Sequence, residues 1–306
     1  MNLSSNGFAN TSDMTEFSSP RIKTITIVTP CYNAEKYIEE TVKSVINNSV
    51  FQTGCAKLEY FICDGGSVDN TCNIVRNIML QASDTNIRMD LISEKDHGMY
   101  DALAKGLRNA TGDICAYINA GDFYSPTAFE IVIDVFRQEN INWLTGLQVR
   151  YNERSHLLSA NLPYKFRKSL IQCGAYGSKL PFIQQESTFW DQKFNCLLDF
   201  ECLSKFRYAG DFFMWKSFAN YGPLYIVEAW LGGFKSHQNQ LSTNIEAYRT
   251  EMNGVALAPT SHDKLLSCID KIIWYSPNRV KRFLNKDTLF SFNFEMQQFA
   301  LRTVDA

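Results

Sequence analysis

Short apolar runs alternate with longer amphipathic stretches along residues 23–119. Four runs are rich in apolar and β-branched residues and stop at a proline, a glycine or a polar turn: 23–30, 59–64, 88–93 and 113–119. Runs of this length and composition are typical of buried strands. We therefore expect a strand at each of these four places.

Helices are predicted between these strands, because apolar residues recur there at intervals of three and four. They cover 34–47, a segment after Ser67, and a segment that begins near Met99. Ser67 is expected to cap the second of these helices. Strands that alternate with helices predict an α/β fold, with a mostly parallel sheet and helices on both of its faces.

Polar loops follow each of the four predicted strands, at 30–33, 64–66, 94–97 and 119–122. In a parallel sheet these loops all lie at the carboxyl ends of the strands. Ligands of open α/β sheets bind at that edge. The pattern thus predicts one ligand site built from these loops.

The second half of the chain has a less regular pattern. We expect a strand at 142–149, a mixed polar and apolar segment at 181–190, a helix that starts near Asp211, and a strand at 223–229. After about residue 245 the periodicity weakens and favours helices. The predicted organisation is a disordered lead-in at 1–20, two halves of one α/β domain at 21–125 and 126–244, and a helical C-terminal extension at 245–306; the family resemblance described below implies nucleotide-sugar binding for the first half and acceptor binding and catalysis for the second.

The composition excludes several classes of protein. Hydrophobic residues make up 45% of the chain and charged residues 20%, which is ordinary for a globular protein. A net charge of −2 gives no electrostatic basis for binding nucleic acid. Nine cysteines without a CxxC pair favour a reducing cytoplasm, and no signal peptide or membrane span is expected.

Six segments that contain these loops resemble, in order, the family 2 glycosyltransferases of the GT-A fold, and most closely the bacterial branch that builds surface polysaccharides. They read ITIVTPCYNAEKYIEETVKSV, FICDGGSVDNT, ISEKDHGMYDALAKGLRNATGDICAYINAGDFY, FIQQESTFW, RYAGDFFMWKSFANYGPLYIV and LGGFKSHQNQLS. The resemblance implies an inverting enzyme that moves a sugar from a nucleoside-diphosphate-sugar to a hydroxyl of a glycan or lipid-linked glycan.

The same resemblance implies a role for the first loops in binding the donor. Pro30, Tyr32 and Asn33 would lie along the nucleoside. Asp64 would accept hydrogen bonds from the base or the ribose, and Asp96 would be a further nucleoside contact. The alternative for Asp64 is a structural one, since an aspartate before two glycines commonly forms a turn.

The loop after the fourth strand departs from the family pattern. Family members usually carry Asp-x-Asp there, whose carboxylates hold Mg²⁺ or Mn²⁺ on the diphosphate of the donor. Here Asn119 and Gly121 occupy the two positions and are assigned to donor binding, and Asp122 follows them. The resemblance implies Asp122 and His237 as the remaining metal ligands, because a hard cation prefers oxygen ligands and shares them with phosphates.

Asp211 is the residue implied as the general base, because it stands where the family places that group, at the start of the helix in YAGDFFMW. The alternative is an aspartate that only complements the helix dipole. Glu186 is the competing carboxylate. Together with Gln185 it is assigned to the side of the acceptor or the donor sugar.

Two other nucleotide-binding α/β folds are excluded by their missing motifs, and one non-enzymatic alternative stays open. A nicotinamide-binding fold requires GxGxxG after its first strand, and a P-loop requires GxxxxGK[ST]; neither motif is present. A catalytically inactive relative, which binds nucleotide-sugar or glycan as a subunit, remains the alternative to an enzyme because the Asp-x-Asp carboxylates are lost.

The segment 276–286 combines basic and apolar residues. Four cations, Arg279, Lys281, Arg282 and Lys286, surround Val280, Phe283 and Leu284. Such a helix is suited to peripheral contact with an anionic membrane at its cytoplasmic face. The alternative is a helix that packs on its own domain with its charges in solvent.

Overall fold

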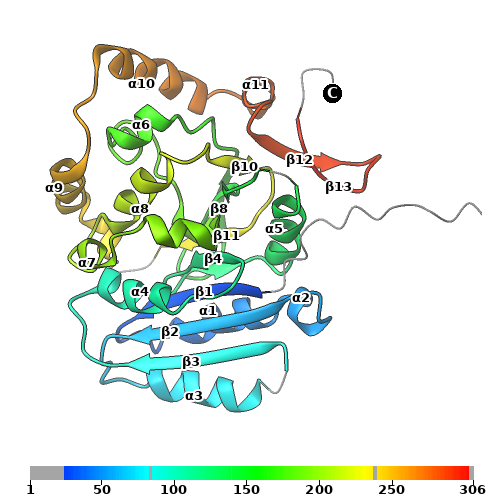
Figure 1. Ribbon diagram of the computed structural model, residues 1–306, viewed down its shortest axis with the longest axis vertical. Helices are drawn as coiled ribbons and strands as arrows, with labels where there is room; N and C mark the ends of the chain where they lie inside the picture. Colours follow the sequence, from blue (N-terminus) through cyan, green and yellow to red (C-terminus); the bar gives the residue numbers. More distant parts are fainter. Residues whose placement is uncertain (1–23, 83–84, 139, 237–239, 303–306) are drawn as a thin grey trace, which may run out of the picture.

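A large twisted sheet runs through the computed structural model, which describes residues 24–82, 85–138, 140–236 and 240–302 (Figure 1). Within these residues the sheet has nine strands. Their spatial order is β13 (Gln298–Leu301), β12 (Leu289–Asn293), β10 (Tyr225–Val227), β6 (Trp143–Thr145), β9 (Thr188–Asp191), β4 (Ile114–Tyr117), β1 (Thr24–Cys31), β2 (Lys57–Asp64) and β3 (Ile87–Ser93). The predicted lead-in at 1–20 lies outside the described residues.

Parallel pairing dominates this sheet. β4, β1, β2 and β3 are mutually parallel, and so are β6, β10 and β12. β9 joins the two parallel groups and runs antiparallel to both β4 and β6. A second sheet has the order β5 (Phe123–Tyr124), β11 (Gly232–Lys235), β7 (Gln148–Tyr151) and β8 (Leu157–Asn161).

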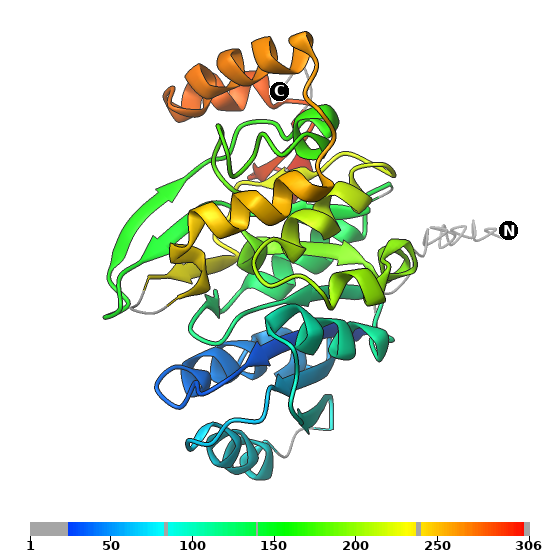
Figure 2. The same cartoon turned by 90° about the vertical axis from the view of Figure 1, so that its left-hand side faces the viewer.

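Helices cover both faces of the sheet, as the alternation of elements predicts. Figure 2 shows α1 and α3 on one side of β1–β3 and α4 on the other. The α-helices are α1 (Ile38–Ile46), α2 (Ser49–Gln52), α3 (Thr71–Gln81), α4 (Met99–Arg108), α5 (Ala128–Phe136), α6 (Lys168–Gln172), α7 (Phe200–Leu203), α8 (Gly210–Phe218), α9 (Ile245–Val255), α10 (Ser261–Trp274) and α11 (Asn278–Leu284). Short 3₁₀ turns lie at Gln185–Ser187, Gln192–Leu197 and Leu241–Thr243. In the described part of the chain, no helix combines the length and apolar character needed to span a bilayer.

The strands predicted in the first 120 residues are confirmed as β1 to β4. The cap predicted for α3 is wrong: the helix begins after Asn70, whose side chain makes no capping bond, and the Ser67 hydroxyl bonds to Asp64 instead. The strand predicted at 142–149 is interrupted at Gly146, where the chain leaves one sheet for the other. A Cβ at this position would lie 2.8 Å from Cγ of Leu231, so only glycine allows this close packing.

The C-terminal region contains the predicted helices, α9 to α11, and also a hairpin that the pattern did not indicate. β12 pairs in parallel with β10, through Ile226 opposite Leu289, and β13 returns antiparallel to it. The two strands extend the main sheet at its edge (Figure 1). Their side chains are only partly buried beyond Phe290, which explains the weak apolar signal in the sequence.

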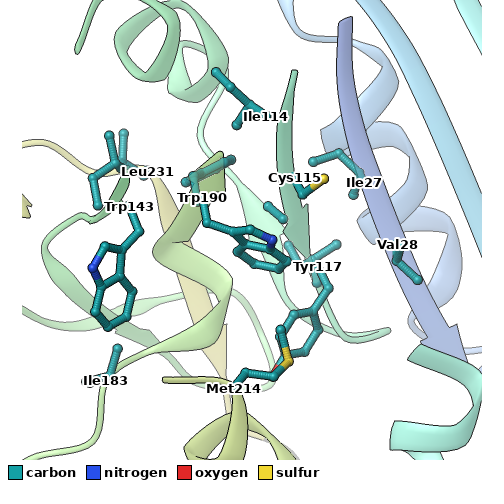
Figure 3. Packing of buried hydrophobic residues seen from close by; sticks show 14 of the residues in the cluster. Ile27, Val28, Ile114, Cys115, Tyr117, Trp143, Ile183, Trp190, Met214 and Leu231 are labelled. Atoms are coloured by element: carbon teal, nitrogen blue, oxygen red, sulfur yellow. The ribbon is translucent and has the colours of Figure 1, made fainter. Parts of the chain in front are cut away.

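Large aromatic side chains fill the core between β4, β9 and α8 (Figure 3). Trp190 is fully buried, its ring centroid lies 6.0 Å from that of Trp215, and its Nε1 donates to Oδ1 of Asn195 at 2.8 Å. Trp143 stacks on Trp215 at 5.9 Å. These tryptophans are therefore part of the core, and they do not present a face to a sugar.

We expect Trp190→Ala to lower the free energy of unfolding by about 3–5 kcal/mol, because it removes a large buried ring and leaves a cavity. Trp230→Ala is the matched control, since that tryptophan is 36% exposed and should cost distinctly less. Urea denaturation followed by circular dichroism measures both values. Equal losses for the two variants would contradict the central place given to Trp190.

Candidate active site

The first two loops at the carboxyl edge of the sheet are bound to each other. The backbone N–H of Asn33 donates to Oγ of Ser67 at 2.7 Å, and Oδ1 of Asn33 accepts from the N–H of Val68 at 3.0 Å. Asn33 has a φ of 47°, a left-handed conformation that asparagine tolerates better than most residues. Pro30, at the end of β1, pairs with Cys63 in the neighbouring strand. The two loops therefore form one rigid rim.

Asp64 lies beneath this rim and is 2% exposed. Its carboxylate accepts from the hydroxyl of Ser67 and from Ser93 Oγ at 2.7 Å, and also from the N–H of Gly66 at 3.2 Å. Burial acts to raise the pKa of Asp64, but these hydrogen bonds outweigh it and hold the pKa below its ordinary value. Asp64 thus organises the loop, and a contact to a nucleoside would have to replace one of these bonds.

Asp96 faces the same loop from the end of β3. A Cβ on Gly65 would lie 2.6 Å from Oδ2 of Asp96, so this glycine allows the close approach of the two loops. Burial raises the pKa of Asp96, and the charges of Asp101 and Asp64 act in the same direction. Asp96 remains partly exposed, and Tyr32 is 63% exposed at the same edge. Both side chains are accessible to a ligand.

The loop 119–122 is held by α1. The N–H of Gly121 donates to Oγ1 of Thr41 at 2.9 Å, and that hydroxyl donates to the carbonyl of Asp122 at 2.7 Å. The N–H of Asp122 closes a turn on the carbonyl of Asn119 at 3.0 Å, with Gly121 at a φ of 115°. Oδ1 of Asn119 is buried and has no hydrogen-bond partner among the described residues.

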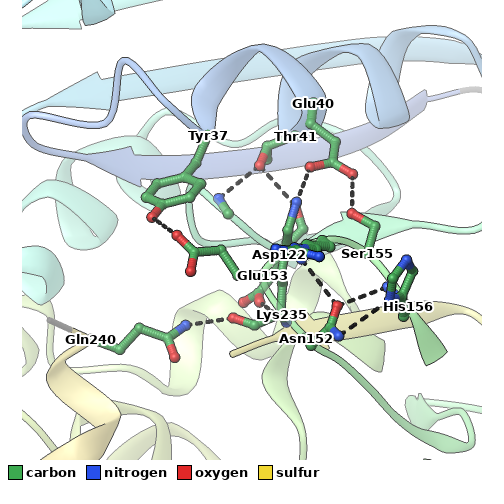
Figure 4. Close-up of polar contacts among 12 residues, drawn as sticks. Tyr37, Glu40, Thr41, Asp122, Asn152, Glu153, Ser155, His156, Lys235 and Gln240 are labelled. Atoms are coloured by element: carbon green, nitrogen blue, oxygen red, sulfur yellow. Dashed lines mark hydrogen bonds and ion pairs between the residues drawn. The ribbon is translucent and has the colours of Figure 1, made fainter. Parts of the chain in front are cut away.

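The carboxylate of Asp122 is 3% exposed and joins three separate segments; Figure 4 shows Asp122 with Lys235 and with Glu40 of α1. Its Oδ1 accepts from the backbone N–H of Lys235 at 2.9 Å, and its Oδ2 accepts from Nε2 of Gln185 at 3.0 Å. The ammonium of Lys235 forms an ion pair with Glu40. Burial raises the pKa of Asp122, and the contacts with Lys235 and Gln185 offset only part of this rise.

Glu186 lies next to this cluster and is 1% exposed. Burial raises its pKa well above the ordinary value, and the neighbouring charge of Asp122 raises it further. A Cβ on Gly232 would lie 1.9 Å from the carbonyl oxygen of Glu186, so β11 approaches this backbone more closely than any other residue would allow. The side-chain oxygens Glu186 Oε1 and Gln185 Oε1 are buried without a hydrogen-bond donor in the described part of the chain.

Asp211, in the first turn of α8, is partly exposed. Its Oδ1 accepts from the N–H of Phe212 at 2.7 Å. The hydroxyls of Tyr248 and Tyr100 lie close enough to lower its pKa through hydrogen bonding, although the Tyr100 hydroxyl also donates to the carbonyl of Tyr208 at 3.1 Å. Burial raises the pKa of Asp211 to about 6, and these hydrogen bonds counteract part of the shift. Its charge also raises the pKa of Glu186, which puts the two carboxyl groups in one electrostatic environment.

Helix α9 fixes the backbone that carries Asp211. Oε2 of Glu251 accepts from the N–H groups of Tyr208 and Ala209 at 2.7 and 2.9 Å. These are the two residues before α8, so the α9 carboxylate bonds to donors at the N-terminal end of that helix. Tyr248, on the same helix, reaches the side chain of Asp211. The C-terminal region is thus a structural part of the site.

The structure brings the predicted residues into two groups. One holds Tyr32, Asn33, Asp64 and Asp96 at the ends of β1 to β3, and the other holds residues 119–122 with Gln185 and Glu186. His237 lies outside the described residues. Among those that are described, no three His, Cys, Asp or Glu side chains are grouped as for a metal ion.

Several contributors were missed by the sequence analysis: Thr41, Lys235, Tyr100, Tyr248 and Glu251. Each acts on a residue far away in the chain, and none belongs to a motif with a fixed spacing. Thr41, Tyr100 and Lys235 lie inside segments that resemble the family, and that position was the signal available for them.

Two cations of the basic segment 276–286 bind to acceptors within the protein. Lys281, on α11, is 4% exposed and its ammonium donates to the carbonyl of Leu162 at 2.7 Å. The guanidinium of Arg282 forms an ion pair with Glu228. The expectation of four solvent-facing cations is wrong for Lys281, which is buried, whereas Arg282 is exposed and is paired with a carboxylate of the protein itself.

A scan against models of known families matches residues 26–198, more than half of the chain, to the model described as glycosyl transferase family 2. Among curated proteins, a chondroitin synthase of Escherichia coli is 31% identical over 119 residues, which are 39% of this chain and 16% of the synthase. UDP-Glc:alpha-D-GlcNAc-diphosphoundecaprenol beta-1,3-glucosyltransferase WfgD of E. coli is 29% identical over 152 residues. That match covers 49% of this chain and 56% of the relative.

Solved structures show the same architecture. Staphylococcus aureus TarS superposes with a TM-score of 0.55 at 15% identity, over 84% of this chain and 44% of TarS. Its fragment 1–349 in complex with UDP gives a TM-score of 0.53 at 15% identity, over 85% of this chain and 74% of that one. These likenesses confirm the expected fold class. Together with the family model, they establish that the chain belongs to glycosyl transferase family 2.

Proposed function

We propose that this protein transfers a sugar from a nucleoside-diphosphate-sugar to a hydroxyl group of a glycan or lipid-linked glycan, with inversion at the anomeric carbon. The observation that carries the proposal is Asp211. It is a partly exposed carboxylate beside the hydroxyls of Tyr100 and Tyr248, and its pKa is raised to about 6. A carboxylate with this pKa is ionised at neutral pH and is a better proton acceptor than an ordinary aspartate.

The reaction is a single displacement. The acceptor oxygen forms a bond to the anomeric carbon while the bond from that carbon to the diphosphate oxygen breaks. The hydroxyl proton passes to the carboxylate of Asp211, and the nucleoside diphosphate leaves with the electron pair. Attack from the face opposite the leaving group inverts the configuration.

The donor is proposed to lie across the two groups of residues. Tyr32, Pro30 and Asn33 would line the nucleoside, Asp96 would accept hydrogen bonds from it, and Asp64 would keep their loops in place. Accessibility supports this division, because Tyr32 and Asp96 are exposed to a ligand whereas Asp64 is buried.

The sugar is proposed to lie against the buried polar cluster. Within the residues that the structure describes, no hydrogen-bond donor reaches Gln185 Oε1 or Glu186 Oε1, and sugar hydroxyls are donors. Burial raises the pKa of Glu186 and so favours its neutral carboxyl group, which can both donate and accept hydrogen bonds. Both features suit a neutral, hydroxyl-rich substrate.

The residues around Asp122 fit a divalent cation that takes most of its ligands from the donor diphosphate. Asp122 supplies one carboxylate, and Asn119 supplies a buried Oδ1 that accepts no hydrogen bond from the described part of the chain. Oxygen ligands of this kind suit Mg²⁺ or Mn²⁺. We propose that Asp122 and Asn119, together with His237, hold the ion, which would neutralise charge on the leaving diphosphate; the backbone of Gly121 would lie beside it.

A lipid-linked acceptor is proposed by analogy with the relative WfgD, whose name specifies an acceptor carried on diphosphoundecaprenol. Such acceptors are embedded in a bilayer, so the protein would work at the cytoplasmic face of a membrane. A role in polysaccharide biosynthesis follows from the same analogy.

Asp211→Asn is expected to reduce kcat by about 10²–10⁴-fold while nucleotide binding is kept, because the proton acceptor is lost but the donor rim is untouched. Transfer is measured with UDP-, GDP- and dTDP-sugars on sugar acceptors linked to a lipid diphosphate. Asp199→Asn, at the N-terminus of α7, is the matched control and should keep full activity. If the wild-type chain binds a nucleotide but transfers from none of these donors, the inactive-relative alternative replaces this proposal.

The rate is expected to depend on pH through Asp211. Because the ionised carboxylate is the active form, kcat/KM should fall tenfold per pH unit below about pH 6. Tyr248→Phe removes a hydrogen bond to the charged form, so the pKa should rise and the acid limb should move to higher pH. Tyr275→Phe alters an exposed tyrosine and should leave the profile unchanged. An acid limb at the same pH in both variants would argue against Asp211 as the base.

Metal dependence is expected in donor binding itself. Calorimetric titration with UDP, GDP and dTDP should give tighter binding of one nucleotide in Mn²⁺ than in EDTA, by about tenfold or more. Asp122→Asn should abolish the difference, whereas Asp134→Asn, a carboxylate on α5, should retain it. Binding that is indifferent to Mn²⁺ in the wild-type protein would refute a metal site at Asp122.

A further inference from the structure

Helix α10 packs Leu266, Ile273 and Trp274 against the core, but it also turns a second set of large apolar residues to solvent. The residues that it buries are Asp263, Ser267, Asp270 and Trp274. The large apolar residues that it exposes are Leu265 at 61%, Ile269 at 43% and Ile272 at 76%. Spacings of four and three residues place these three on one face. A helix that packs on its own domain normally turns such a face inward.

Polar contacts explain this orientation. Asp270 is fully buried and accepts from Nε of Arg167 at 2.8 Å and from its Nη2 at 3.2 Å. Asp263 forms a capping box with Thr260 at the start of the helix. Breaking a buried ion pair by turning the helix over would leave a charge unpaired, which is strongly unfavourable. The apolar face is therefore fixed outward.

The apolar face continues onto α11. The two helices pack side by side at the end of the molecule opposite α3, as both ribbon views show (Figures 1 and 2). Phe283 is 72% exposed and Val280 is 42% exposed, and Tyr275, between the helices, is 76% exposed. Large apolar side chains gathered in this way mark an interaction site more often than a bare surface.

The charges around this face decide which partner fits. Between residues 261 and 286 the acidic residues are Asp263 and Asp270, and both are buried. Lys264, Lys271 and Arg279 are exposed there, and Lys286 lies 5.9 Å from the ring centroid of Phe283. The protein as a whole has a net charge of −2, so this positive charge is local.

We propose that the exposed face of α10 and α11 is a membrane-docking surface, on which Leu265, Ile269, Ile272 and Phe283 enter the interface of an anionic phospholipid bilayer and the flanking cations bind its head groups. A helix with an apolar face and basic flanks lies in the plane of such an interface. A second copy of the chain is a poorer occupant, because a self-complementary contact would set these cations against each other. The surface is distinct from 276–286 alone, since it depends on α10 and omits Lys281 and Arg282.

The full chain is tested by flotation with vesicles of phosphatidylcholine alone and with vesicles that also contain phosphatidylglycerol. We expect binding to the anionic vesicles, weakened by added salt and absent with phosphatidylcholine alone. Leu265→Glu with Ile272→Glu should weaken it at least tenfold. Lys264→Gln with Lys271→Gln should weaken it by about twenty-five-fold, since each cation near an anionic surface contributes about fivefold.

Leu80→Glu is the matched control, because Leu80 is 84% exposed on α3 at the other end of the molecule. It should bind vesicles like the wild-type protein. All substituted side chains are exposed, so the variants should keep the wild-type Tm. Failure of the wild-type chain to bind anionic vesicles, or unchanged binding of the α10 variants, would overturn the proposal. A wild-type dimer that becomes a monomer in Leu265→Glu with Ile272→Glu would overturn it in favour of a second copy. Vesicle binding requires no sugar transfer, so this test is independent of the proposed activity.

Discussion

The buried carboxylate of Asp122 is the contact on which the rest of the site depends. It links the loop after β4 to the backbone of β11 and to the amide of Gln185 before β9. Three segments that are separated by 50 to 113 positions in the chain therefore meet at one side chain. Glu186, which β11 approaches at Gly232, and Lys235, which pairs with Glu40, take their positions from the same junction. The loss of the two carboxylates before Asp122 leaves this junction intact, because neither of its hydrogen bonds involves Asn119 or Gly121.

The three carboxyl groups in the site differ in environment and so in chemical use. Glu186 is buried, and its Oε1 accepts no hydrogen bond from the described residues. Burial and the neighbouring charge of Asp122 both favour its neutral form. Asp122 accepts two N–H bonds, which favours its charged form against the effect of burial. Asp211 is reached by two tyrosine hydroxyls and stays partly exposed. Burial thus raises the pKa of all three carboxyl groups, and the hydrogen bonds and neighbouring charges differ between them, which is consistent with the separate roles proposed for them.

The rim of the site was predictable because its position follows from local rules. Apolar runs identify β1 to β4, parallel strands end at one edge, and the polar loops after them must meet there. Asp211 was found only through the resemblance to the family, since its sequence context alone is equally that of a helix-dipole partner. The hydroxyls of Tyr100 and Tyr248 could not be found in this way, because contacts over 111 and 37 positions leave no periodic signal. Ser67 shows the reverse error: its position suited a helix cap, but the buried carboxylate of Asp64 offered a stronger acceptor.

In helix α10, the periodicity of the sequence identifies an apolar face but does not decide whether that face turns to the core or to solvent. The spacing of Leu265, Ile269 and Ile272 defines an apolar face, and the usual inference turns that face toward the core. Here the choice is made by Asp270, which has its cationic partner, Arg167, inside the protein. The position of α10 is also compatible with the site, because α9 directly precedes it. In α9, Tyr248 reaches Asp211, and Glu251 binds the backbone before α8. One C-terminal segment can therefore support the proposed base on one side of the molecule and present an apolar, basic surface at its end.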